Sequence, residues 1–145
     1  MSEMVIRTNN LTKSYGNHIA LDSLNLEVPK GATGLLGPNG AGKSTFLKTI
    51  LGLIQATSGD GIVLGHDIRT EGEEIRTKIG YMPEYDALNP KMDAINQVRY
   101  SGEILGMHPN IALTRAHKSL EYVGLGEQRY REIGSFSTGM KQATK

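Results

Sequence analysis

The sequence predicts an α/β fold, and three features of the chain support this prediction. Short apolar runs between glycines are typical of strands joined by tight turns, and they extend to about residue 87. Amphipathic helical patterns follow them, and glycine accounts for 18 of the 145 residues, against an average of about 7%. We therefore expect a strand-rich α/β region over 1–87, a helical region over 88–134 and a closing segment over 135–145.

The first predicted elements lie on either side of a glycine-rich loop. Residues 24–28 alternate apolar and polar side chains, which predicts a half-exposed strand, and the apolar run 32–37 predicts a buried one. A helix is expected from about residue 43 to about residue 53, and Gly52 suits its end. The apolar side chains at helical spacing in this stretch are Phe46, Leu47, Ile50 and Leu51.

Two further short elements are expected before the helical region. The stretch "GIVLG" (61–65) is typical of a short strand between glycines. The stretch "EEIRTKIGYM" (73–82) predicts one or two helical turns, followed by a strand through Ile79, Tyr81 and Met82.

Two amphipathic helices are predicted in the helical region. Asp93 can cap a helix that runs to about Leu105, with Ile95, Val98 and Leu105 on one face. A second helix is expected over 110–123, and Gly124 would end it. The apolar face of this second helix comprises Leu113, Ala116, Leu120 and Val123.

The composition limits the classes of function. The net charge of +1 gives no long-range attraction to nucleic acid, so no nucleic-acid partner is expected. The absence of cysteine excludes disulfides and thiol chemistry. No apolar stretch is long enough to span a bilayer, and the N-terminus lacks the pattern of a secretory signal. A cytoplasmic location is therefore expected.

The stretch "GPNGAGKST" (37–45) matches the phosphate-binding loop pattern G-x-x-x-x-G-K-[ST]. Backbone N–H groups of such a loop converge on phosphate oxygens, and the following helix N-terminus adds partial positive charge. Lys43 would neutralise the β- and γ-phosphates of a nucleotide, and the Ser44 hydroxyl would ligate Mg²⁺. The alternative is a glycine-rich turn before an ordinary helix. The residues expected to bind the nucleotide here are Gly37, Pro38, Asn39, Gly40, Ala41, Gly42, Lys43, Ser44 and Thr45.

The order of the motifs resembles that of the ATP-binding subunit of ABC transporters over essentially the whole chain. The resemblance rests on "LTKSYGNHIALDSLNLEVPKG", the phosphate loop with its flanks, "IGYMPE" and "FSTGMKQ". It implies a P-loop NTPase with a RecA-like core, an N-terminal antiparallel β subdomain and a helical subdomain. It also implies that the sequence stops before the Walker B strand, which carries the family's Mg²⁺-binding Asp and water-polarising Glu. The chain is therefore expected to be catalytically incomplete.

The resemblance assigns roles to two residues outside the phosphate loop. Tyr15 stands where the family places an aromatic ring under the adenine of ATP, and the alternative is a tyrosine packed on a strand surface. Glu84 stands where the family usually has a glutamine that approaches Mg²⁺ and the attacking water. This makes Glu84 a candidate metal ligand and, with Lys43, a candidate catalytic residue. The alternative for Glu84 is a solvated loop acid.

The stretch "FSTGM" (136–140) resembles the family's signature, which is usually Leu-Ser-Gly-Gly-Gln. Ser137 and Gly139 match that signature, whereas Thr138 and Met140 depart from it. Ser137 can cap the following helix, and its hydroxyl with the Gly139 N–H can bind an anionic oxygen. In the family the signature contacts ATP on the phosphate loop of a second ATP-binding subunit, paired head to tail. The alternative is a frayed C-terminal tail.

The resemblance implies an ATPase, with ATP and Mg²⁺ as cofactors, that drives a membrane permease from the inner face of the cell membrane. The permease is expected to dock near Glu84 and the helical subdomain, and "STGMK" is similar to sequences of exporter-type subunits. Three other interpretations remain open. They are a soluble ABC-type ATPase acting on nucleic acid or ribosomes, a different P-loop enzyme such as a kinase or GTPase, and an inactive fragment.

Overall fold

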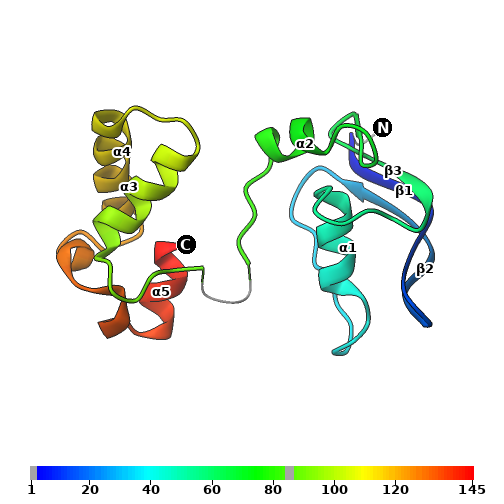
Figure 1. The fold of residues 1–145 in the computed structure, drawn as a ribbon, viewed down its shortest axis with the longest axis horizontal. Helices are drawn as coiled ribbons and strands as arrows, with labels where there is room; N and C mark the ends of the chain where they lie inside the picture. The colour runs from blue at the N-terminus through cyan, green and yellow to red at the C-terminus, as the bar shows by residue number, and fades with distance from the viewer. Residues whose placement is uncertain (1–2, 84–86) are drawn as a thin grey trace. The chain divides into compact units, whose positions relative to one another are not determined.

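The structure is a computed structural model that describes residues 3–83 and 87–145. The chain divides into two compact units, residues 1–80 and residues 81–145, each shown as a ribbon in Figure 1. Each unit has its own cluster of buried apolar side chains. The two units are therefore described separately.

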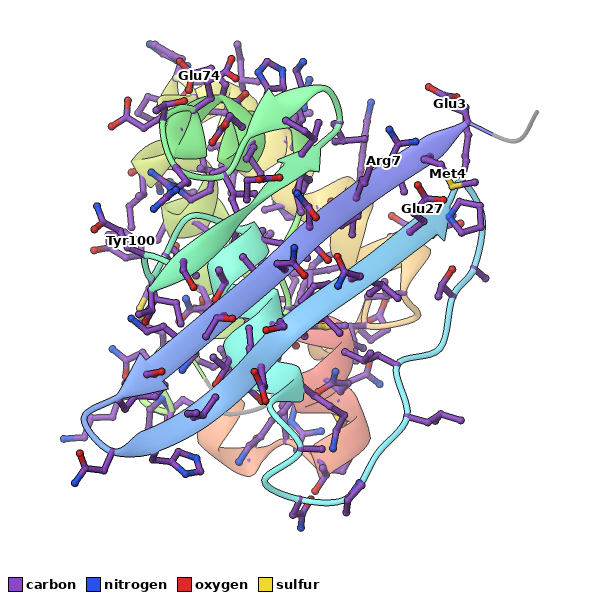
Figure 2. The ribbon with its side chains drawn as sticks, turned by 90° about the vertical axis from the view of Figure 1, so that its right-hand side faces the viewer. Glu3, Met4, Arg7, Glu27, Glu74 and Tyr100 are labelled. Carbon is purple, nitrogen blue, oxygen red and sulfur yellow. The ribbon has the colours of Figure 1, made fainter. Side chains whose placement is uncertain are left out.

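The first unit contains a four-stranded antiparallel sheet in the order β2-β1-β3-β4. Figure 2 shows β1 and β2 as two long neighbouring ribbons, on which Arg7 and Glu27 are register partners. This sheet agrees with the antiparallel β subdomain that the family resemblance implies. The strands are β1 (Met4–Tyr15), β2 (His18–Pro29), β3 (Ser58–Val63) and β4 (His66–Asp67).

The core of the first unit joins the sheet to helix α1 (Lys43–Ile50). Leu11 and Leu21 from the hairpin are buried in one cluster with Phe46 and Ile50 from α1. Since α1 begins at the end of the glycine-rich loop, this cluster fixes the loop's helical side against the sheet. Leu47 was predicted on the same apolar face but is 39% exposed.

Helix α2 (Gly72–Lys78) follows a hydrogen-bonded turn after β4. Glu71 Oε2 accepts the Asp67 N–H at 2.8 Å, and Glu71 Oε1 lies 2.9 Å from His66 Nδ1. These contacts, the Asp67 N–H first, hold the pKa of the Glu71 carboxyl below its usual value. The helical turns predicted within residues 73–82 are therefore present, and a charged turn fixes their start.

Two strand predictions in the first 87 residues are wrong. Neither 32–37 nor 79–82 is a strand in the structure, and Leu36 is 93% exposed. A strand needs a neighbour to bond its N–H and C=O groups, and no strand among the described residues pairs with either segment. The strand predicted at 24–28 lies within β2, and the strand predicted at 61–65 overlaps β3, which ends at Val63.

The second unit is helical, as predicted. The Asp93 side chain accepts the Asn96 N–H at 2.9 Å and caps α3, and Gly124 at φ +78° follows the end of α4. Leu105 and Val123 were predicted on apolar faces but are 79% and 42% exposed, because both lie beyond the last helical turn. The helices are α3 (Ala94–Ile104), α4 (Pro109–Tyr122) and α5 (Thr138–Thr144), with 3₁₀ turns η1 (Gln128–Tyr130) and η2 (Ile133–Ser135).

Candidate functional site

The glycine-rich loop turns on two residues with left-handed backbone. Gly40 has φ +85° and Gly42 has φ +81°, a region that glycine adopts without steric penalty. The Ala41 N–H donates to the Pro38 carbonyl at 3.2 Å, and Gly42 is the N-cap of α1. The segment matched by the sequence pattern is thus a loop that leads into a helix, as predicted. The residues directly before it, 32–37, are not a strand.

Gly42 also holds the loop against the sheet. A Cβ at this position would lie 2.2 Å from the Ala20 carbonyl oxygen and 3.0 Å from Leu21 Cδ2. The first of these contacts is with backbone and is too short for any side chain. The loop therefore rests directly on β2, and the sequence pattern alone gave no sign of this long-range contact.

The Lys43 side chain folds back over the loop instead of extending into solvent. Its Nζ donates to the Gly37 carbonyl at 2.6 Å and to the Pro38 carbonyl at 2.7 Å. These two oxygens are neutral, so an anionic phosphate oxygen that approaches the loop is a stronger acceptor for the same ammonium group. The charge thus lies where a nucleotide's phosphates would be bound.

The groups of the loop fit a triphosphate with its metal. The loop offers one ammonium, the hydroxyls of Ser44 and Thr45, and a helix N-terminus with its partial positive charge. A Cβ at Gly40 would meet no atom within 4 Å, so the space beside the loop is open. Hydroxyl and phosphate oxygens are the ligands that Mg²⁺ prefers. Among the described residues, no group of three or more acidic or histidine side chains is placed to hold a metal.

Tyr15 lies at the end of β1 with 49% of its surface exposed. Leu11, Lys13 and Tyr15 alternate along the strand, and Leu11 belongs to the core cluster that includes Phe46 of α1. Tyr15 therefore lies on the same face of β1 as Leu11, which packs near α1, but closer to the hairpin turn. A half-exposed ring in this place is available for stacking, and Lys13 Nζ lies 5.0 Å from its centroid. Lys13 was not among the predicted site residues, although its spacing of two from Tyr15 was a visible signal.

Most of residues 135–145 form the capped helix α5 (Thr138–Thr144) and not a frayed tail. Ser137 is the N-cap of α5, and its Oγ accepts the Met140 N–H at 3.3 Å, as predicted. Phe136 is 5% exposed, and Met140 packs against the same cluster of buried side chains. Met140, which departs from the family's signature, thus has a place in the core of this unit. Gly139 lies in the first turn of α5, two residues from Ser137.

Glu84 lies outside the described residues, but the structure describes the segments on either side of it. On one side, Gln142 Nε2 lies 3.3 Å from Met82 Sδ. On the other side, the Asn89 N–H donates to Gln97 Oε1 at 2.9 Å, which ties the chain to α3. Both flanks of Glu84 therefore contact helices of the second unit.

The predicted site residues fall into two groups. Tyr15 and the whole loop 37–45 belong to the first unit, and Ser137 and Gly139 belong to the second. Within the first unit, strand β2 connects Tyr15 with the loop 37–45, because β2 pairs with β1 and contacts Gly42. In the part of the chain that the structure describes, no helix is long and apolar enough to cross a membrane.

Comparison with protein families and curated proteins gives consistent matches. The family model described as ABC transporter matches residues 21–145. The Nod factor export ATP-binding protein I of Cupriavidus metallidurans is 34% identical, and the linearmycin resistance ATP-binding protein LnrL of Bacillus subtilis is 38% identical, each over 95% of this chain. The bacitracin transport ATP-binding protein BcrA of Bacillus licheniformis is 37% identical over the same share. The chain spans 46%, 45% and 44% of these three relatives, respectively.

Solved structures give the same picture for the fold. The ADP conformation of an ATP-binding cassette of an ABC transporter superposes with a TM-score of 0.79 at 26% identity, covering 99% of this chain and 63% of that one. CbiO1 of Clostridium perfringens, described as part of an ABC transporter complex, gives a TM-score of 0.82 at 21% identity. That match covers 98% of this chain and 59% of the other, and it supports the fold alone.

Proposed function

The chain belongs to the ABC transporter family, and from this premise we propose that it binds ATP with Mg²⁺ as part of the energy-coupling subunit of a membrane transporter. The observation that carries the proposal is the ammonium of Lys43, held inside the loop 37–45 by two carbonyl oxygens. A cation in that position, at the start of α1, is suited to the terminal phosphates of a nucleotide.

Most of the proposed contacts with the nucleotide come from residues of the first unit. Lys43 and the backbone of the loop bind the phosphates, and Ser44 offers a hydroxyl oxygen to Mg²⁺. Tyr15 stacks on adenine, a contact worth about 1–3 kcal/mol when a base lies on an aromatic side chain. Glu84 is proposed as a further ligand to the metal, and Lys43 and Glu84 as the residues that act on the reacting phosphate.

The second unit is proposed to serve a different nucleotide. Ser137 and Gly139 would contact ATP held by the phosphate loop of a second ATP-binding subunit in a head-to-tail pair. The cap of α5 supports this proposal, because it fixes the Ser137 hydroxyl at the start of a helix anchored by Phe136. ATP binding would close the pair, and hydrolysis would reopen it.

The partner that receives this motion is proposed to be a separate transmembrane permease, docked near Glu84 and the helical unit at the inner face of the cell membrane. Three relatives are named for Nod factor export, linearmycin resistance and bacitracin transport. These names favour a transporter subunit over a soluble ATPase that acts on nucleic acid. The net charge of +1 gives no support to a nucleic-acid partner.

Equilibrium dialysis with Mg-ATP tests the proposed function. Lys43→Met keeps the length of the side chain but removes its charge, and we expect it to weaken binding by about tenfold or more, since a charge-assisted hydrogen bond contributes about 1.5–3 kcal/mol. Lys48→Met, an exposed lysine of the same helix, is the matched control and should bind like the wild type. Circular dichroism of both variants checks that the fold is retained. Equal affinity of Lys43→Met and the wild type would contradict the assignment of the loop.

A further inference from the structure

We propose that Lys13 is a further residue of the nucleotide site, which covers the Tyr15 ring and is displaced when the base of a nucleotide stacks there. This inference rests on the proposed function of the loop and of Tyr15. Its starting point is the position of Lys13 Nζ, 5.0 Å from the centroid of the Tyr15 ring. An ammonium within about 6 Å of an aromatic centroid is attracted by the negative face of the ring.

The register of the hairpin shows where Lys13 lies along β1, relative to Tyr15 and to the phosphate loop. Lys13 pairs with Leu21, whereas Tyr15 pairs with His18, nearer the hairpin turn. Leu21 and its neighbour Ala20 are the residues that contact Gly42 of the phosphate loop. Along β1, therefore, the direction from Tyr15 to Lys13 is also the direction toward the phosphate loop.

A nucleotide whose phosphates lie in the loop must bring its base to Tyr15 from that same direction. Lys13 and the base then compete for one face of the ring, because the ammonium and a stacked adenine cannot both occupy it. Tyr15 is 49% exposed, so it has room for a base once Lys13 has moved. The displaced ammonium stays near an anionic ligand, where its charge still favours binding of the phosphates.

This competition predicts how Lys13 shapes affinity. Lys13 lowers the contribution of the base to the binding affinity, because stacking of the base must replace the cation–π contact between Lys13 and Tyr15. It does not lower the contribution of the phosphates. With Lys13 over the Tyr15 ring, the affinity therefore depends more on the phosphates of the ligand. It depends less on the identity of the base than it would without Lys13.

Calorimetry with two ligands, Mg-ATP and Mg-tripolyphosphate, separates these contributions, because tripolyphosphate has no base. We expect Lys13→Met to raise the ratio of ATP affinity to tripolyphosphate affinity by about two- to fivefold, the value of an exposed cation–π contact. Lys13→Arg keeps a cation over the ring and should leave the ratio unchanged. Lys118→Met, an exposed lysine on α4, makes the same change in net charge and should also leave it unchanged.

A double-mutant cycle and a spectroscopic signal complete the test. In a Tyr15→Ala background, Lys13→Met should no longer alter the ratio, since the contested ring is absent. In the wild type, the ring current should shift the Lys13 side-chain protons upfield in the NMR spectrum, and saturating Mg-ATP should reverse that shift.

The outcomes distinguish this inference from the function on which it rests. A wild type that binds neither ligand, or a Lys43→Met variant that binds both normally, would overturn the phosphate loop and Lys13 together. Binding that depends on Lys43, combined with an unchanged ratio in Lys13→Met or an upfield Lys13 signal that persists with ATP, would overturn the role of Lys13 alone.

Discussion

The two units of the molecule differ in the sequence separation of the hydrogen bonds that form their strands and helix caps. In residues 1–80, Thr8 Oγ1 donates to the Leu24 carbonyl, and the Ser14 N–H donates to Thr57 Oγ1. In residues 81–145, the caps of α3 and α5 join residues three apart in sequence. The sheet unit therefore depends on closing long segments of chain, whereas much of the helical unit forms from neighbours.

The two parts of the proposed site are held in different ways. The phosphate loop is held by a distant contact, where Gly42 abuts Ala20 of β2. The signature segment is held by its own cap, by Phe136 and Met140 in the core cluster of the second unit, and by the contact of Gln142 with Met82. A change in the sheet should therefore reach the phosphate loop, while the signature segment should respond mainly to changes in its own helix and core.

The largest expected effect comes from the core of the sheet unit. Leu11 is 0% exposed, and Leu11→Ala should lower the free energy of unfolding of this unit by about 2–5 kcal/mol through lost burial and the cavity left behind. Hydrogen exchange of the β1 and β2 amides measures this loss. Leu11→Met keeps most of the volume and should cost less than about 1.5 kcal/mol. Equal exchange rates in Leu11→Ala and wild type would refute the view that this cluster supports the loop.

A smaller effect is expected at the cap of α3. Asp93→Ala removes the acceptor for the Asn96 N–H and should destabilise the helical unit by about 1 kcal/mol. Asp93→Asn retains a capping oxygen and should stay close to the wild type. Exchange of the α3 amides, read alongside thermal unfolding, gives the measurement. A loss as large as that of Leu11→Ala would show that Asp93 holds more than its own helix.

The smallest effect is expected for two ion pairs, an exposed one chosen from the first unit and a partly buried one from the second. Arg7 Nε lies 2.8 Å from Glu27 Oε1 across two strands, and Arg99 Nε lies 2.6 Å from Glu103 Oε1 within one helix. Double-mutant cycles should give coupling energies of about 0.2–1 kcal/mol for the first pair and about 0.3–0.5 kcal/mol for the second. Both couplings should fall at 1 M salt. A coupling above 2 kcal/mol that persists in salt would mean that a pair is far less solvated than its exposure indicates.

Local signals in the sequence predicted the helices and their ends well. Asp93 and Ser137 cap helices as expected, and Gly52 and Gly124 follow helix ends with left-handed backbone. These predictions succeeded because a cap involves only the few residues around it. The phosphate loop was predicted for the same reason, since its pattern is contiguous.

Two strand predictions failed, because the predicted segments have no pairing strand among the described residues. Leu35 and Leu36 lie in a run that has the composition of a buried strand, yet they are 44% and 93% exposed. The composition of a segment indicates that it could form a strand. Strand formation also requires a second strand beside it that bonds to its backbone. Strand β1 is the opposite case, a strand that no sequence pattern predicted. A register shift between Thr8 and Leu11 interrupts the alternation of side chains along it.

The phosphate-loop motif, the helix caps and the family follow from the sequence alone, because each depends on residues that are contiguous or occur in a fixed order. Three contacts became visible only in the folded chain: Gly42 rests on Ala20, Lys43 turns back into the loop, and Lys13 covers Tyr15. The physical reason is that backbone turns and caps are governed by neighbours in the chain. Contacts between strands and loops depend on a register that forms only when distant segments pack together.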